Sequence, residues 1–164
     1  RYPFKIKSLE RAVVRTRNMI QTILSISLFA IFTTIGFIHF YWLFGGKWGI
    51  NNALPTEENG EKAMKPPRIA TAIVALGLIS FGLLYLVKTG IFNNQVPNWI
   101  ITYGGWIIPT IFILRTIGDF KYVGLFKKIK HTDFAKADTK LFVPLCLSIG
   151  IIGIIIPNFI YVRI

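Results

Sequence analysis

Side chains with useful chemistry are concentrated in two short stretches of this sequence. The first stretch, FIHFYWLFGGKWG at residues 37–49, contains His39, Tyr41, Trp42 and Trp48 beside Gly45 and Gly46. Histidine titrates nearest to neutral pH, so His39 has the chemistry of a general base, a proton relay or a metal ligand. A structural histidine, hydrogen-bonded within a belt of aromatic residues, is the simpler interpretation. The residue types alone leave both open.

The second stretch, RTIGDFKYVG at residues 115–124, contains Arg115, Asp119 and Tyr122. Arg115 follows an apolar run, and a guanidinium costs about 2.5–3.5 kcal/mol at the centre of a membrane helix and less near its end. Asp119 lies four residues later, so an ion pair within one helix is available if that helix continues. Alternatively, Arg115 extends to the lipid headgroups and Asp119 caps the interfacial helix expected to follow.

The spacing of the residues argues against a metal site and against a nucleotide-binding motif. His131 is the only other histidine, and neither a histidine nor a carboxylate lies three or four residues from His39. The glycines form no phosphate-binding motif and are expected to end a helix and turn the chain. The single cysteine, Cys146, is expected to be structural. We therefore predict that the protein holds no metal and no cofactor, and we assign no residue a catalytic role.

Four long uncharged runs must form the elements that position these residues. Mean hydropathy is +0.56, and the runs are Asn18 to Gly46, Ile69 to Val87, Thr89 to Leu114 and Leu141 to Val162. A bilayer core about 30 Å thick needs roughly 20 apolar helical residues. The sequence predicts an all-α polytopic membrane protein, a four-transmembrane-helix bundle over residues 19–164, with spans at about 20–44, 69–88, 97–117 and 141–162.

Two charged segments carry amphipathic patterns. Residues 1–18 form a basic arm with Tyr2, Ile6, Leu9 and Val13 spaced four, three and four apart. This pattern predicts an interfacial helix in the headgroup plane. Residues 118–140 repeat the pattern, so a second interfacial amphipathic helix is expected there. The formal net charge of +12 flanks the spans, which favours anionic lipid headgroups as partners over nucleic acid.

Four spans place both long connections at one end of the bundle and the two termini at the other. His39, Tyr41, Trp42, Trp48, Arg115, Asp119 and Tyr122 are then expected at one end, which we call the polar mouth. The positive-inside comparison nearly ties, with eight basic residues on the terminal side and ten on the other. Because the first helix usually dominates, we expect a multi-pass protein of the cell (inner) membrane with a cytoplasmic N-terminus.

Several motifs resemble a known family. IHFYWLFGGKWG, then ALP, then LRTIGDFKYVGLFKK, and DTKLFVPLC before the last span resemble a family of small bacterial four-helix integral membrane proteins known only as a domain of unknown function. The resemblance begins near Ile20 and leaves out the arm. It implies a four-helix fold and one shared feature, and it implies no reaction. The residues of that feature are His39, Trp42, Gly45, Gly46, Trp48, Arg115, Asp119, Asp138 and Pro144.

Three hypotheses on function follow from the residues. In the first, a non-enzymatic module binds a lipid headgroup or small anion, or docks a partner membrane protein, at the polar mouth through Arg115. In the second, a small membrane enzyme acts on a lipid or isoprenoid with His39 as acid or base and Asp119 or Asp138 as its orienting group. In the third, the chain is an accessory subunit of a larger complex or a homo-oligomer.

Overall fold

The computed structural model describes residues 3–57, 61–63, 66–90 and 96–160. Residues 1 and 2 of the predicted arm and residues 161 and 162 of the fourth predicted span lie outside this set. The described elements, in chain order, are α1 (Pro3–Leu43), α2 (Ile50–Ala53), α3 (Arg68–Val87), α4 (Asn98–Ile117), α5 (Asp133–Ala137), the π-helical turn η1 (Asp138–Phe142) and α6 (Val143–Ile160).

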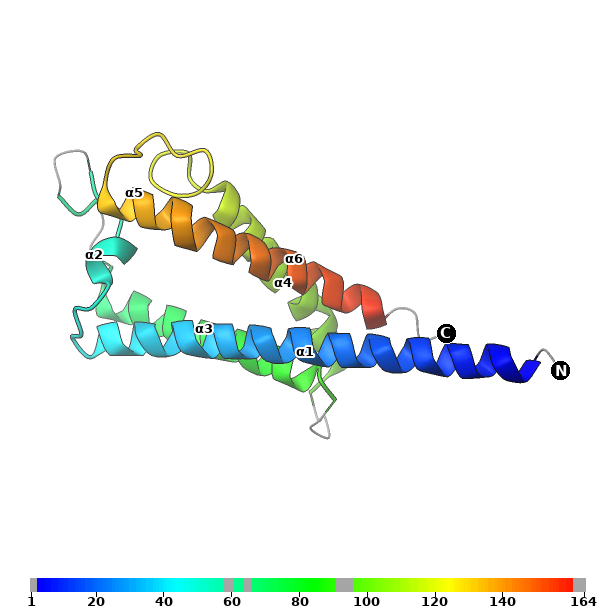
Figure 1. Ribbon diagram of the computed structural model, residues 1–164. Helices are drawn as coiled ribbons and strands as arrows, with labels where there is room; N and C mark the ends of the chain where they lie inside the picture. The colour runs from blue at the N-terminus through cyan, green and yellow to red at the C-terminus, as the bar shows by residue number, and fades with distance from the viewer. Residues whose placement is uncertain (1–2, 58–60, 64–65, 91–95, 161–164) are drawn as a thin grey trace.

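Four helical segments are long and apolar enough to cross a membrane, which confirms the predicted all-α fold of a multi-pass membrane bundle. These segments are Lys7–Leu43, Arg68–Val87, Asn98–Ile117 and Asp133–Ile156. The helices associate as two pairs, α1 with α3 and α4 with α6 (Figure 1). α3 and α4 touch only weakly, although a short connection joins them. Both long connections lie at the end that carries α2 and α5, as the span count predicts.

Close packing inside the bundle depends on aromatic rings and on small residues. Phe32 of α1 stacks on Tyr85 of α3, with ring centroids 5.8 Å apart, and meets the edge of Phe112 of α4 at 5.2 Å. A Cβ atom at Gly153 of α6 would lie 2.9 Å from the Cβ of Pro109 in α4. Since lipid gives no hydrophobic drive between helices, such close approach supplies much of the packing energy.

The basic arm differs from the sequence prediction. It is not a separate helix, because α1 runs without interruption from Pro3 to Leu43. No glycine or proline occurs in residues 4–35, so nothing in the sequence provides a break. Forty-one residues make a helix about 60 Å long, roughly twice the thickness of the bilayer core. The arm therefore extends beyond the other helices along the axis of the first span (Figure 1).

The third connection also differs from the amphipathic helix expected there. Residues 118–132 form turns and bends, and helix resumes only at Asp133, where the Thr132 hydroxyl accepts a hydrogen bond from the N–H of Ala135 at 3.1 Å. α5, η1 and α6 then continue as one helical segment. Gly118, with φ of 87°, ends α4 because it adopts a backbone conformation that residues with a Cβ rarely adopt. The expected helix cannot form through this turn.

The packing analysis predicts unequal effects of adding the same side chain at two helical glycines. Gly153→Val should lower the melting temperature of the detergent-solubilised protein by several degrees, because overpacking against Pro109 costs about 1–3 kcal/mol. Gly77→Val is the matched control, since a Cβ there meets no atom within 4 Å. Equal melting temperatures for the two variants would show that α4 and α6 do not pack as closely as described.

Candidate functional site

The centre of the site is a carboxylate buried completely at the start of the last span. Asp138 has no exposed surface, and its Oδ1 accepts a hydrogen bond from Nη2 of Arg115 at 2.9 Å. Its Oδ2 accepts from Nζ of Lys127 at 2.9 Å and from the N–H of Gly124 at 2.9 Å. A buried carboxylate requires such compensation, because leaving water costs several kcal/mol per ion. We call Arg115, Lys127 and Asp138 the charged cluster.

Lys127 is fully engaged within this cluster. Its side chain is almost completely buried, and its ammonium also donates to the carbonyl of Gly124 at 3.1 Å and to the hydroxyl of Thr139 at 2.7 Å. These two bonds and the bond to Asp138 use all three donors of an ammonium group. Lys127 therefore holds the loop of residues 118–132 against the last span and has no donor left for a ligand.

Arg115 has spare donors. Its Nη2 binds Asp138, whereas its Nη1 is buried and has no hydrogen-bond partner among the described residues. A third of the side chain is exposed, so Arg115 lies at the edge of the cluster, although its Nη1 atom is itself buried. An arginine carries five N–H donors and stays charged, which suits it to bind a second anion beside Asp138.

The π turn gives Asp138 its place on the helix. The N–H of Val143 donates to the carbonyl of Asp138, five residues earlier, where an α-helix would use the residue four before. The sequence provides a physical reason, because Pro144 has no N–H and its ring would press on the carbonyl of Lys140 in a regular helix. The sequence analysis linked Asp138 and Pro144 by resemblance alone, and the wider turn gives that link a structural basis.

Two glycines allow the loop to return to the end of α4. A Cβ at Gly118 would collide with the carbonyl of Val123, and a Cβ at Gly124 would lie 2.6 Å from the Cα of Gly118. The N–H of Leu125 donates to the carbonyl of Thr116 at 2.9 Å, which closes the loop. This contact between two backbone segments brings Gly124 and Lys127 to Asp138.

Asp119 does not pair with Arg115, so the proposed intrahelical ion pair is wrong. α4 ends at Ile117, and Oδ1 of Asp119 instead accepts from the N–H groups of Lys121, Tyr122 and Val123 at 2.9, 2.7 and 2.9 Å. The alternative prediction, that Asp119 caps a following interfacial helix, is wrong about the helix, because the three N–H groups belong to the turns of residues 118–132. Burial raises the pKa of Asp119, but hydrogen bonds from the backbone lower it more, so its pKa lies below the usual range.

The aromatic residues form a second group, at the end of α1. Nδ1 of His39 lies 2.9 Å from the carbonyl of Ile35 in its own helix, and its ring meets Trp42 edge to face at 4.9 Å. Nε1 of Trp42 donates to the carbonyl of Trp48 at 2.8 Å. The ring of Tyr41 fills the place that a side chain at position 46 would occupy, so a larger residue there would require Tyr41 to move. We call this group the aromatic turn.

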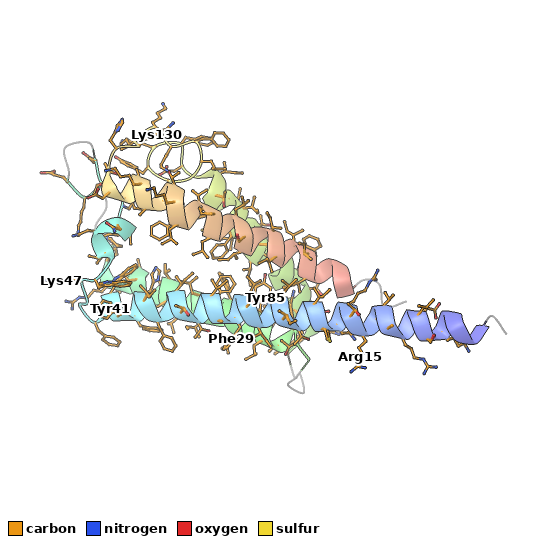
Figure 2. All side chains as sticks on the ribbon, viewed as in Figure 1. Arg15, Phe29, Tyr41, Lys47, Tyr85 and Lys130 are labelled. Carbon is orange, nitrogen blue, oxygen red and sulfur yellow. The ribbon has the colours of Figure 1, made fainter. Side chains whose placement is uncertain are left out.

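The two groups lie at the same end of the bundle, with Tyr41 and Lys47 on one side and Lys130 on the other (Figure 2). α2 contacts α5, and the hydroxyl of Tyr122 lies 3.5 Å from a carboxylate oxygen of Glu57. Within the described ranges, no hydrogen bond or ring contact joins His39 to Asp119 or Asp138. Among the described residues, His39 therefore contacts its own helix and Trp42 rather than either carboxylate.

The sequence analysis missed Lys127, Thr139, Gly118 and Gly124. Lys127 is one of several lysines in the third connection, and nothing in the sequence distinguishes it from its exposed neighbours Lys121, Lys128 and Lys130. The glycines carried a signal, because Gly118 and Gly124 lie only six positions apart, with Asp119 and Tyr122 between them, in a segment that we expected to be helical. No group of three or more potential metal ligands occurs among the residues that the structure describes.

Removal of the buried carboxylate should be much more damaging than removal of an exposed one nearby. We expect Asp138→Ala to cost about 3–5 kcal/mol, because two cations lose their common partner. Asp133→Ala is the control, since Asp133 is 83% exposed and lies 3.5 Å from an exposed Lys136. Thermal unfolding in detergent measures both variants. A smaller loss for Asp138→Ala than for Asp133→Ala would contradict the burial of this cluster.

The depressed pKa of Asp119 predicts how the loop responds to acid. A carboxylate with a lowered pKa stabilises the fold above its ordinary pKa of about 3.9, and this contribution is lost only as the pH falls through the lower folded value. Hydrogen exchange at Tyr122 and Val123, corrected for intrinsic rates, should keep its protection from pH 8 to pH 5. Asp119→Ala should raise exchange about fivefold, the effect of losing a cap worth about 1 kcal/mol. Loss of protection between pH 8 and pH 5 in the unaltered protein would refute this assignment.

Comparison with known proteins gives one match. A family model described as a protein of unknown function (DUF3995) matches residues 32–153, which include the aromatic turn and the charged cluster and leave out the N-terminal part of α1. The match begins at residue 32, later than the resemblance near Ile20 suggested. Neither the curated proteins nor the solved structures compared with this chain give a match. Because the match covers most of the chain, this membrane protein belongs to the DUF3995 family.

Proposed function

We propose that this protein is a non-enzymatic membrane module that binds the phosphate of an anionic lipid headgroup at Arg115. The observation that carries the proposal is the charge of the cluster, in which two cations share one carboxylate. Arg115 and Lys127 contribute two positive charges and Asp138 one negative charge, so one positive charge remains uncompensated. Lys127 has no free donor, and the excess charge is therefore available at the guanidinium of Arg115.

The position of Arg115 supports a ligand that approaches from the membrane interface. Arg115 lies in the last turn of α4, within the span Asn98–Ile117 and two residues before its end. Its unpartnered Nη1 is next to the Nη2 that binds Asp138, so two adjacent N–H groups can be offered to a phosphate in a bidentate arrangement. A buried donor without a partner costs about 1–3 kcal/mol, which binding of an anion would recover.

The loop beside the cluster has the surface of a segment that enters the headgroup region. Its exposed residues include Phe120, Leu125 and Phe126, and the rings of Phe120 and Phe126 stack at 6.2 Å. Exposed lysines alternate with these apolar side chains, namely Lys121, Lys128 and Lys130. Apolar groups that insert beside lysines attract anionic lipids, each lysine contributing about 1 kcal/mol near the surface.

Lipid retention tests the proposal. The full chain is extracted in mild detergent, supplied with phosphatidylglycerol or phosphatidylcholine, and examined by native mass spectrometry. We expect the unaltered protein to retain phosphatidylglycerol in preference to phosphatidylcholine and Arg115→Gln to lose that preference about tenfold, because the cluster charge falls from +1 to zero. Arg115→Lys should restore part of it.

Arg68→Gln is the matched control, since Arg68 is an exposed arginine that begins α3 at the same end of the bundle. Equal retention in the unaltered protein and in Arg115→Gln would refute the proposal. A second arm adds inorganic phosphate alone: stabilisation of the unaltered protein by phosphate, without lipid preference, would identify a small anion as the ligand and would contradict the headgroup assignment.

A further inference from the structure

α1 has an exposed face that the bundle does not use. The face that packs on the other helices carries Ser25, Leu28, Phe32 and Gly36, all buried. A different set of positions, alternately three and four residues apart, follows the opposite side of the helix. This seam consists of Leu9, Val13, Thr16, Ile20, Ile23, Ser27, Ala30, Thr34, Phe37 and Tyr41, and every one of these residues is exposed.

The seam has the period of a coiled coil. Alternating steps of three and four over more than four heptads are the pattern of a and d positions, in which one helix packs against another. In and just after the arm, the a positions hold Val13 and Ile20, and the d positions hold Leu9 and Thr16. β-Branched residues at a with leucine at d favour parallel pairs of helices. We propose that this seam pairs α1 with α1 of a second copy of the chain.

The composition of the seam changes where the helix enters the bilayer. Leu9 and Val13 lie in the arm and are exposed, so large apolar side chains there gain most from burial if the arm is in water. Within the span, the side chains of the seam are small at Ser27, Ala30 and Thr34. Small residues permit close approach of helices in lipid, where hydrophobic burial gives no drive. The same face of α1 is therefore suited to pack against a partner helix both in the arm and within the bilayer.

Charge favours a second copy over other occupants. No charged residue lies on the seam from Leu9 to Tyr41, and Arg11 and Arg15 lie away from it, at f and c positions. Two such uncharged faces can meet without burying a charge. Two copies inserted with the same topology necessarily place their α1 helices parallel.

The alternative occupant of the arm is the lipid surface, and the geometry disfavours it. The arm continues the axis of the first span without a break, so it leaves the membrane rather than lying on it. An isolated helix of fewer than about 12–15 residues is marginal in water. Pairing with a second arm would stabilise this segment and cover Leu9 and Val13.

Cysteine cross-linking in membranes tests the proposal with a closely matched pair. Val13 and Val14 are the same residue type and are both 52% exposed, but only Val13 is on the seam. A disulfide requires Cα atoms about 4.4–6.8 Å apart, a distance reached at an a position of a parallel pair and not at a b position. Mild oxidation of Val13→Cys should give a band at twice the monomer mass, with several-fold less from Val14→Cys.

The unaltered chain is the blank, because its only cysteine, Cys146, is buried. Equal cross-linking of the two variants would indicate random collision and would overturn the proposal. The proposal would also fail if Val13→Cys gave no dimer, or if it cross-linked to a protein of different mass. A second comparison by native mass spectrometry addresses the span: Ala30→Phe should reduce the dimer several-fold, whereas Ile26→Phe, at an exposed position off the seam, should not. Loss of dimer in neither variant would show that the span does not pair through this face.

Discussion

Complete burial of Asp138 is the constraint on which one end of this protein depends. A carboxylate removed from water has to be neutralised, and the two cations that pair with it come from the end of α4 and from the loop that follows it. To deliver Lys127, the loop must turn back at Gly118 and pass against itself at Gly124. Three features therefore serve together to neutralise Asp138: the irregular loop, the π turn before Pro144 and the direction of Arg115.

The same constraint separates two kinds of residue within the site. Lys127 is enclosed and spends every donor on the protein, so its role is to hold the loop in place. Arg115 lies at the edge, is partly exposed and has an unpartnered nitrogen. The aromatic turn, with its own internal hydrogen bonds, belongs to the same end of the bundle but to a different structural unit. Its contribution is to end α1 and start the first connection.

The sequence predicts the fold well because each span is a long uncharged run whose length matches a bilayer. The predicted ends agree closely with α3 and α4. The site was harder to predict because its contacts cross the chain. Asp119, four residues from Arg115, was the nearer partner on a helical pattern, whereas the true partner, Asp138, lies 23 residues away. Gly118 carried the missing signal, since a helix that ends there cannot bring Asp119 over Arg115.

A double-mutant cycle on Arg115 and Asp138 tests the central claim, that this ion pair organises the end of the bundle. Thermal unfolding of Arg115→Met, Asp138→Leu and the double variant gives the coupling free energy. We expect the double variant to be less destabilised than the sum of the single variants by about 1–3 kcal/mol, because the Arg115–Asp138 interaction is lost in both single variants and is counted twice in their sum. Additivity within about 0.5 kcal/mol would show that Arg115 and Asp138 do not interact and would contradict this account.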